Sequence, residues 1–221
     1  MIIGFEGHSY TGKTTLVEAI ASTRGVTVIP EADVYAGGID NYPPFPHESV
    51  DMAIENVNYF VKLEESRRQD ADAATGTVVV DRTFISVALF QKFIRELNRP
   101  GWESALDYAR EVYHDRINQA KVILPDAMVV VLCANEQEYA SRLSREISID
   151  ELRSVEAYRF FTKEYSRLLR GYDDLGRLAV IVSANGDNPK ETGDHVLERL
   201  DFPCLDVSKK VQLAYDILGG M

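Results

Sequence analysis

A short apolar segment at the start of the chain runs directly into a glycine-rich turn. Residues 2–6 have the composition of a buried strand, and the next eight residues read Gly7-His-Ser-Tyr-Thr-Gly-Lys-Thr14. This is the full pattern G-x-x-x-x-G-K-[ST], in which a backbone loop binds phosphate through its N–H groups. Glycine suits both ends of such a loop because the backbone has to curl tightly there. The segment therefore predicts a strand, a phosphate-binding loop and a helix over residues 13–23.

The loop residues have predicted roles toward a bound nucleoside triphosphate. Lys13 is expected to reach the β- and γ-phosphates of ATP, and the Thr14 hydroxyl to ligate Mg²⁺. Because the loop opens a helix, the positive end of the helix dipole faces the same anion. The residues expected to bind the cofactor are Gly7, His8, Ser9, Tyr10, Thr11, Gly12, Lys13, Thr14 and Thr15.

Apolar runs rich in β-branched residues alternate with longer segments of helical periodicity. The expected strands cover residues 2–6, 26–30, 77–81, 127–134 and 179–183, and the longer helices cover 48–75, 84–97 and 102–119. Capping patterns at Asn135, Ser148 and Asn188 predict three further helix starts. Such alternation is typical of parallel strands joined by crossover helices. We therefore predict the α/β fold of P-loop NTPases, a five-stranded parallel sheet with helices on both faces.

Length and composition narrow the class of protein. A chain of 221 residues fits one domain, and no apolar run approaches the length needed to cross a bilayer. No basic region precedes the N-terminal apolar stretch, so we expect a cytoplasmic protein without a membrane partner. The net charge of −11 argues against a nucleic-acid polymer as a partner. Cys133 and Cys204 are expected to be buried thiols rather than a disulfide.

Charged side chains follow two of the predicted strands at their carboxyl ends, where ligands bind in such folds. Asp81 is expected to hold Mg²⁺ through a water molecule, and Arg82 to neutralise the transferring phosphoryl group or orient the acceptor. A mutual salt bridge between them is the alternative. Glu31 is expected to orient an acceptor hydroxyl and take its proton, with a solvated loop position as the alternative.

Two arginines lie on the helix expected after the fourth strand. Arg142 and Arg145 are three residues apart and so share a helical face, from which they are expected to bind the transferring phosphate. A solvated basic face is the alternative. After the fifth strand, Asn185 is expected to meet the edge of the adenine base.

These pieces occur in the order found in thymidylate kinases. The sequence resembles that family in Phe5-Glu-Gly-x-x-x-x-Gly-Lys-Thr-Thr15, Asp81-Arg-x-x-x-Ser86, Leu124-Pro-Asp126, Arg142-x-x-Arg145 and Phe160-Phe-x-x-x-Tyr165. Pro30-Glu31 and the spacing from Tyr59 to Arg67 are similar to deoxynucleoside kinases, which have a general base, a base-stacking aromatic and a phosphate-side arginine at these places.

The resemblance implies one kinase domain over residues 1–221, with an acceptor-binding helical region at about 34–75 and a short lid at about 142–153. It implies catalytic roles for Lys13, Glu31, Arg82, Arg142 and Arg145. The implied acceptor-binding residues are Glu31, Tyr59, Leu63, Arg67 and Arg82.

The sequence also departs from both families. Ser9 stands where thymidylate kinases carry an acid in the loop, and Leu63 where they carry a stacking phenylalanine. Phe60 stands where deoxynucleoside kinases use a glutamine to pair with the base, and Glu31-Ala-Asp-Val-Tyr35 replaces a Glu-Pro-Gly-Gly-Thr segment. The base and the sugar of the acceptor stay open at this level.

The leading hypothesis is an ATP- and Mg²⁺-dependent kinase of a nucleoside or nucleoside monophosphate. A kinase of another metabolite hydroxyl is one alternative, because a fold does not define its acceptor. A nucleotide-binding regulatory module is another. Its GTPase version is disfavoured, since no N-K-x-D sequence follows the fourth strand. The sequence does not decide the oligomeric state, and a homodimer is one of the alternatives.

Overall fold

The computed structural model describes residues 1–22, 25–144, 153–183, 188–200 and 202–221. The chain forms two compact units, each assembled from three segments. Unit 1 contains Met1–Val28, Thr75–Asp81 and Pro125–Cys204, and unit 2 contains Ile29–Ala74, Arg82–Leu124 and Leu205–Met221. That the whole chain acts as one kinase domain stays a prediction.

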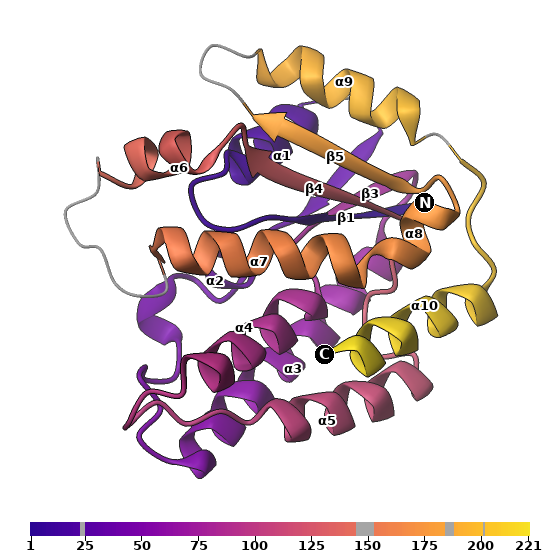
Figure 1. The fold of residues 1–221 in the computed structure, drawn as a ribbon. Coiled ribbons are helices and arrows are strands. Elements are labelled where there is room, and N and C mark those ends of the chain that lie inside the picture. The colour runs from indigo at the N-terminus through magenta and orange to yellow at the C-terminus, as the bar shows by residue number, and fades with distance from the viewer. Residues whose placement is uncertain (23–24, 145–152, 184–187, 201) are drawn as a thin grey trace. The chain divides into compact units, whose positions relative to one another are not determined.

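Unit 1 is built on a five-stranded sheet in the order β2-β3-β1-β4-β5 (Figure 1). The strands are β1 Ile2–Glu6, β2 Val26–Ile29, β3 Thr77–Asp81, β4 Ala127–Cys133 and β5 Leu178–Ser183; the last residue of β2 belongs to unit 2. β1 pairs in parallel with β3 and β4, and β4 with β5. Each predicted strand is confirmed to within one residue at either end.

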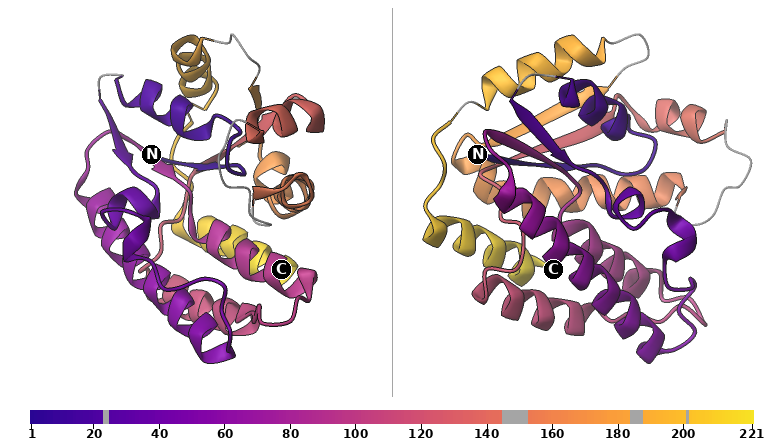
Figure 2. Two further views of the ribbon diagram at one scale, coloured as in Figure 1. Left: turned by 90° about the vertical axis from the view of Figure 1, so that its left-hand side faces the viewer. Right: turned by 180° about the vertical axis from the view of Figure 1, so that it is seen from behind.

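Helices cover both faces of this sheet (Figure 2). On one face, α1 Lys13–Ala21 and α9 Pro189–Arg199 bury apolar side chains against the strands; this core includes Ile3, Phe5, Val129, Leu16, Ile20 and Val196. Neighbouring side chains of a strand point to opposite faces, so Glu6 faces away from that core. It accepts a hydrogen bond from Tyr165 of α7 Val155–Leu168. The predicted α/β architecture is confirmed.

Local caps begin several of these helices. Asn135 accepts a hydrogen bond from the Glu138 N–H at the start of α6 Glu136–Leu143, and Asn188 caps α9 in the same way, as predicted. The predicted cap at Ser148 lies outside the described residues. A short helix, α8 Arg170–Asp174, leads into β5.

Unit 2 is helical. Its elements are α2 Ala32–Tyr35, the 3₁₀ turn η1 Ile39–Asn41, α3 Val50–Ala73, α4 Phe84–Leu97, α5 Leu106–Asn118 and α10 Val207–Gly220. The predicted bounds of α4 are confirmed, whereas α5 begins four residues later than predicted. The side-chain oxygen of Gln91 accepts a hydrogen bond from the Ala105 N–H, and its backbone carbonyl oxygen accepts one from the Ser104 hydroxyl. These tertiary contacts hold residues 104 and 105 outside the helix.

The structure also bears on the predictions made for the two cysteines and for membrane-spanning segments. Both cysteines are free thiols; Cys133 is buried as predicted, whereas Cys204 is exposed, so the prediction of a second buried thiol is wrong. Within the described residues, no helix combines the length and apolar character that crossing a bilayer requires.

Candidate active site

The two glycines of the phosphate-binding loop lie where a side chain would not fit. A Cβ on Gly7 would lie 2.6 Å from the Val131 carbonyl oxygen, at the closest approach of the loop to β4. Gly12 precedes α1 with φ +91°, and its Cβ would lie 2.9 Å from the Ser183 hydroxyl. Because L side chains avoid this conformation and this space is already filled, the glycine pattern has a direct structural cause.

The loop is followed by the residues predicted to face the phosphates. The ammonium group of Lys13 forms an ion pair with the Asp81 carboxylate, and both side chains are 3% exposed. Parallel pairing sets Asp81 beside Phe5 in the sheet, near the start of the loop. Thr14 and Thr15 lie in the first turn of α1 and are exposed. The structure thus brings the predicted phosphate-binding lysine and the predicted metal-binding aspartate together.

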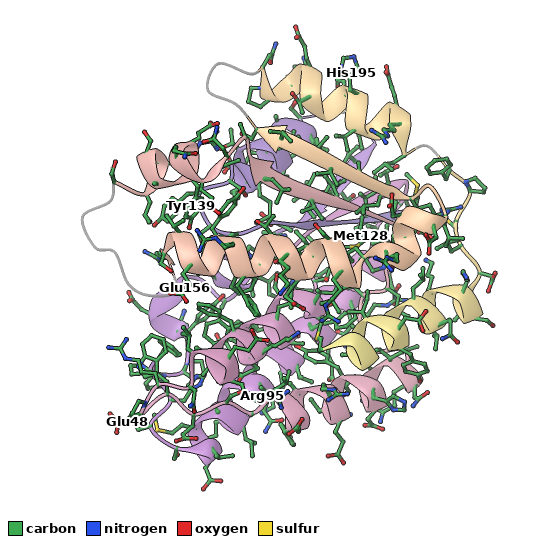
Figure 3. The ribbon with its side chains drawn as sticks, viewed as in Figure 1. Glu48, Arg95, Met128, Tyr139, Glu156 and His195 are labelled. Carbon is green, nitrogen blue, oxygen red and sulfur yellow. The ribbon has the colours of Figure 1, made fainter. Side chains whose placement is uncertain are left out.

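Hydrogen bonds of His8 and Thr11 hold the loop, one within the loop itself and one to helix α6. The Thr11 hydroxyl donates to the His8 carbonyl oxygen at 2.9 Å. The imidazole of His8 is buried, and its Nδ1 shares a hydrogen bond of 2.9 Å with the Tyr139 hydroxyl of α6. The side chain of Tyr139 points from α6 toward α7 (Figure 3). Its ring stacks on that of Tyr158 in α7. Burial raises the pKa of Tyr139, so its hydroxyl stays protonated beside the loop.

Arg142 contacts the loop from the same helix. Its guanidinium donates to the Tyr10 carbonyl oxygen at 3.2 Å and to the Ser183 carbonyl oxygen at 3.0 Å, and it pairs with Glu138 at 2.5 Å. Tyr10 has φ +66°, so Arg142 bonds to a left-handed turn of the backbone. Ser9 and Tyr10 are half-buried. Two predicted site residues, Arg145 and Asn185, lie outside the described residues.

Unit 2 contains the residues predicted to serve the acceptor. Glu31 stands immediately before α2, and its carboxylate pairs with Nε of Arg82 at 2.5 Å. Their side chains are 25% and 20% exposed, so the pair stays partly open to solvent. Each charge of the predicted Asp81-Arg82 cluster thus has a partner from elsewhere in the chain: Lys13 for Asp81 and Glu31 for Arg82.

The remaining predicted acceptor residues lie on α3. Arg67 is buried, pairs with Glu64 at 2.9 Å and donates to the Arg82 carbonyl oxygen at 2.8 Å. Tyr59 and Leu63 are half-buried. The Tyr59 ring meets Phe60 edge to face, with centroids 5.5 Å apart.

Comparison with known proteins supports the fold. No protein-family model matches the sequence, and no curated protein sequence is significantly similar to it. Solved structures do match its fold, among them the three that follow. A deoxyadenosine kinase from M. mycoides with dCMP and a flexible dCDP bound is 17% identical, with a TM-score of 0.60 over 91% of this chain and 99% of that chain.

The second, the NadR protein in complex with NR, is 16% identical, with a TM-score of 0.60 over 93% of this chain and 53% of that chain. A thymidylate kinase from Ehrlichia chaffeensis is 16% identical, with a TM-score of 0.51 over 91% and 98%. The fold is that of the P-loop nucleoside and nucleotide kinases. The predicted resemblance is confirmed at the level of the fold.

The residues of this P-loop kinase fold are suited to Mg²⁺ held jointly with phosphate. The described residues contain no group of three or more His, Cys, Asp or Glu side chains that could hold a metal ion. Magnesium bound with a nucleotide needs only one or two protein oxygens, because phosphates and water supply the rest. Asp81 and Thr14 offer such oxygens next to the loop, whose positions 7 and 12 have room only for glycine.

One aromatic residue near the predicted acceptor residues had no role predicted from the sequence. Tyr42 lies in the proline-rich stretch Asn41-Tyr-Pro-Pro-Phe-Pro46. In unit 2 its ring meets Tyr59 and Phe60 edge to face, with centroids 5.8 and 4.9 Å away. Burial, followed by the nearby carboxylates of Asp33 and Glu31, raises the pKa of its hydroxyl. An aromatic residue directly before two prolines was the only available sequence signal.

Proposed function

We propose that the chain is an ATP- and Mg²⁺-dependent phosphotransferase that acts on a nucleoside or nucleoside monophosphate. The observation that carries the proposal is the Glu31–Arg82 ion pair of unit 2. Unit 1 of the same chain has the complete phosphate-binding loop pattern. A loop alone accounts for ATP binding, whereas a carboxylate aligned by a guanidinium can also activate an acceptor hydroxyl.

In this proposal, unit 1 binds the phosphate donor. Lys13 would bind phosphate oxygens in place of the Asp81 carboxylate, and Asp81 and Thr14 would then hold Mg²⁺. The metal, when bound, would neutralise charge that builds up on the phosphates. Arg142, which bonds to Tyr10 in the loop, supports this site, and most of the predicted lid at 142–153 lies outside the described residues.

In this proposal, unit 2 supplies the residues that bind the acceptor, including the region at about 34–75. Glu31 accepts the proton of the attacking hydroxyl late in the transfer, and Arg82 holds the carboxylate in place. The rings of Tyr42, Tyr59 and Phe60 form an aromatic cluster suited to a planar base.

The test is a screen of nucleosides, nucleoside monophosphates and unrelated hydroxyl compounds, with ADP release and acceptor phosphorylation both measured. We expect transfer to at least one nucleoside or nucleotide. ATP hydrolysis unaffected by every acceptor would favour the regulatory module, and transfer only to an unrelated compound would favour the other class of kinase.

Substitution Glu31→Gln then tests the catalytic assignment. With a nucleoside acceptor it should lower transfer about 10²- to 10⁴-fold, the range for loss of a general base, and leave ATP binding unchanged. With a monophosphate acceptor it should mainly raise the Michaelis constant of the acceptor. Glu65→Gln is the matched control, since Glu65 pairs with Arg116 in the same unit. A change confined to ATP affinity would contradict the assignment.

A further inference from the structure

A buried ion pair lies on α3, within the region proposed to bind the acceptor. Arg67 and Glu64 are 2.9 Å apart, and each side chain is 4% exposed. The second oxygen of Glu64 accepts a hydrogen bond from the Ile123 N–H at 3.3 Å. Removing one partner of such a pair leaves an uncompensated buried charge, so the pair is costly to break. Arg67 is therefore held firmly in place.

The other end of the Arg67 guanidinium reaches the backbone between β3 and α4. Its Nη2 donates to the Arg82 carbonyl oxygen at 2.8 Å. Arg82 has φ +60°, a conformation that residues with a Cβ rarely adopt and that the surroundings must stabilise. The next residue, Thr83, already caps α4 by accepting from the Ile85 N–H. One left-handed residue thus joins the strand to the helix, and Arg67 bonds to it directly.

The side chain of this left-handed residue is the one that meets Glu31. The backbone angles of Arg82 set the direction in which its side chain leaves the chain, so the bond from Arg67 to the Arg82 carbonyl oxygen helps to fix that direction. From there the Arg82 guanidinium reaches Glu31 at 2.5 Å. A continuous series of contacts therefore runs from Glu64 through Arg67 and Arg82 to Glu31.

We infer that Arg67 is a positioning residue for Arg82 and Glu31, and that the acceptor is an uncharged nucleoside rather than a nucleoside monophosphate. This inference rests on the proposed function. Arg67 and Arg82 each face a carboxylate, so their charges are balanced within the protein. A phosphate dianion would compete with Glu64 or Glu31 for one of these arginines. Arg67 also donates to the Arg82 carbonyl oxygen, and Glu64 accepts from the Ile123 N–H, so the buried pair is held at both ends and its exchange is unfavourable. A hydroxyl acceptor requires no such exchange.

The acceptor screen separates this inference from the proposed function. Preference for nucleosides over their monophosphates, judged by kcat/KM, is the expected result. Preference for the monophosphates would overturn the inference and leave the proposed kinase activity standing. Absence of transfer to both classes would instead overturn the proposed function, and the inference with it.

Arg67→Lys tests the positioning role, because lysine keeps the charge and loses the forked geometry. We expect kcat with a nucleoside to fall about 10²-fold, the loss typical of a catalytic group displaced by about 1 Å. The Michaelis constants for ATP and nucleoside should stay nearly unchanged. Arg68→Lys is the matched control, because Arg68 is the next residue and pairs with Asp72 at the surface. A higher acceptor KM with kcat retained would show that Arg67 binds the acceptor, and would overturn the inference.

A double substitution gives a readout that a general structural role would not produce. If Arg67 acts through Glu31, Arg67→Lys combined with Glu31→Gln should be no slower than Glu31→Gln alone. Fully multiplicative losses would contradict the positioning role. If Arg67→Lys does not fold, Glu64→Leu with Arg67→Met removes both buried charges together and retains packing volume. The same loss of kcat is expected from this pair, and wild-type kcat would overturn the inference.

Discussion

Lys13 and Asp81 form a buried ion pair although 68 positions separate them in the sequence. The same two residues are proposed to bind phosphate and Mg²⁺. Since each neutralises the other, we expect binding of a nucleotide and binding of the metal to be coupled through the exchange of this pair. The coupling can be measured from either side.

Asp81→Asn should weaken the dependence on Mg²⁺ and strengthen the binding of metal-free ATP. An amide is a poorer ligand for Mg²⁺ and does not compete with phosphate for the charge of Lys13. We expect the Mg²⁺ concentration for half-maximal rate to rise about tenfold or more, equivalent to about 1.4 kcal/mol. ATP titrations with and without Mg²⁺ check both effects. An unchanged Mg²⁺ dependence would remove Asp81 from the metal site.

Lys13→Ala should abolish turnover and also destabilise the protein. The structure buries this side chain against the Asp81 carboxylate. Removing it leaves a buried carboxylate without its partner, at a cost of about 3–5 kcal/mol. Chemical denaturation measures that cost. The double variant Lys13→Ala with Asp81→Asn should recover much of the stability and none of the activity.

Tyr139→Phe should reduce ATP affinity without changing the acceptor KM. The lost hydroxyl is the one that bonds to His8 in the loop, and a single hydrogen bond contributes about 1 kcal/mol, or about fivefold in affinity. Tyr158→Phe is the control, because Tyr158 stacks on the same ring but donates to the Cys133 carbonyl oxygen. Equal losses in the two variants would show a packing effect rather than support of the loop.

His47 should make the stability of the protein depend on pH. The ring is 0% exposed and packs near Phe45 and Phe90. Burial lowers its pKa, and the backbone of Glu103 offsets only part of this shift. The unfolded chain therefore binds a proton more readily than the folded one as the pH falls through about 6.5. Stability should be fully present above that pH and decrease below it.

Urea unfolding at about pH 7 and about pH 5 measures this dependence. His47→Phe keeps an aromatic ring and removes the titrating group, so the variant should lose less stability on acidification than the wild type. His114→Phe is the control, since His114 is exposed and stacks on Tyr215. The same loss of stability in wild type and His47→Phe would refute the assignment.

Local sequence patterns were sufficient for the five strands and for the bounds of α4. The strands of unit 1 are short apolar runs because parallel strands are covered on both faces, and this composition identifies them without tertiary information. The bounds of α4 are equally local, with Thr83 capping its start and Asn98 ending it in a left-handed conformation. The residue before α5 is Ala105, which has no capping side chain, and contacts of residues 104 and 105 with Gln91 accompany the later start of this helix.

By itself, the sequence determined the phosphate-binding loop, the five strands and the identity of most charged residues at their ends. The loop could be identified because its function requires glycine and lysine at fixed spacing along one segment. Only the tertiary structure decided which polar groups meet: Lys13 with Asp81 and Arg82 with Glu31 as ion pairs, and His8 with Tyr139, 131 positions away, through a hydrogen bond. Ion pairs and hydrogen bonds depend on distance through space and on burial, and spacing along the chain specifies neither for residues so far apart.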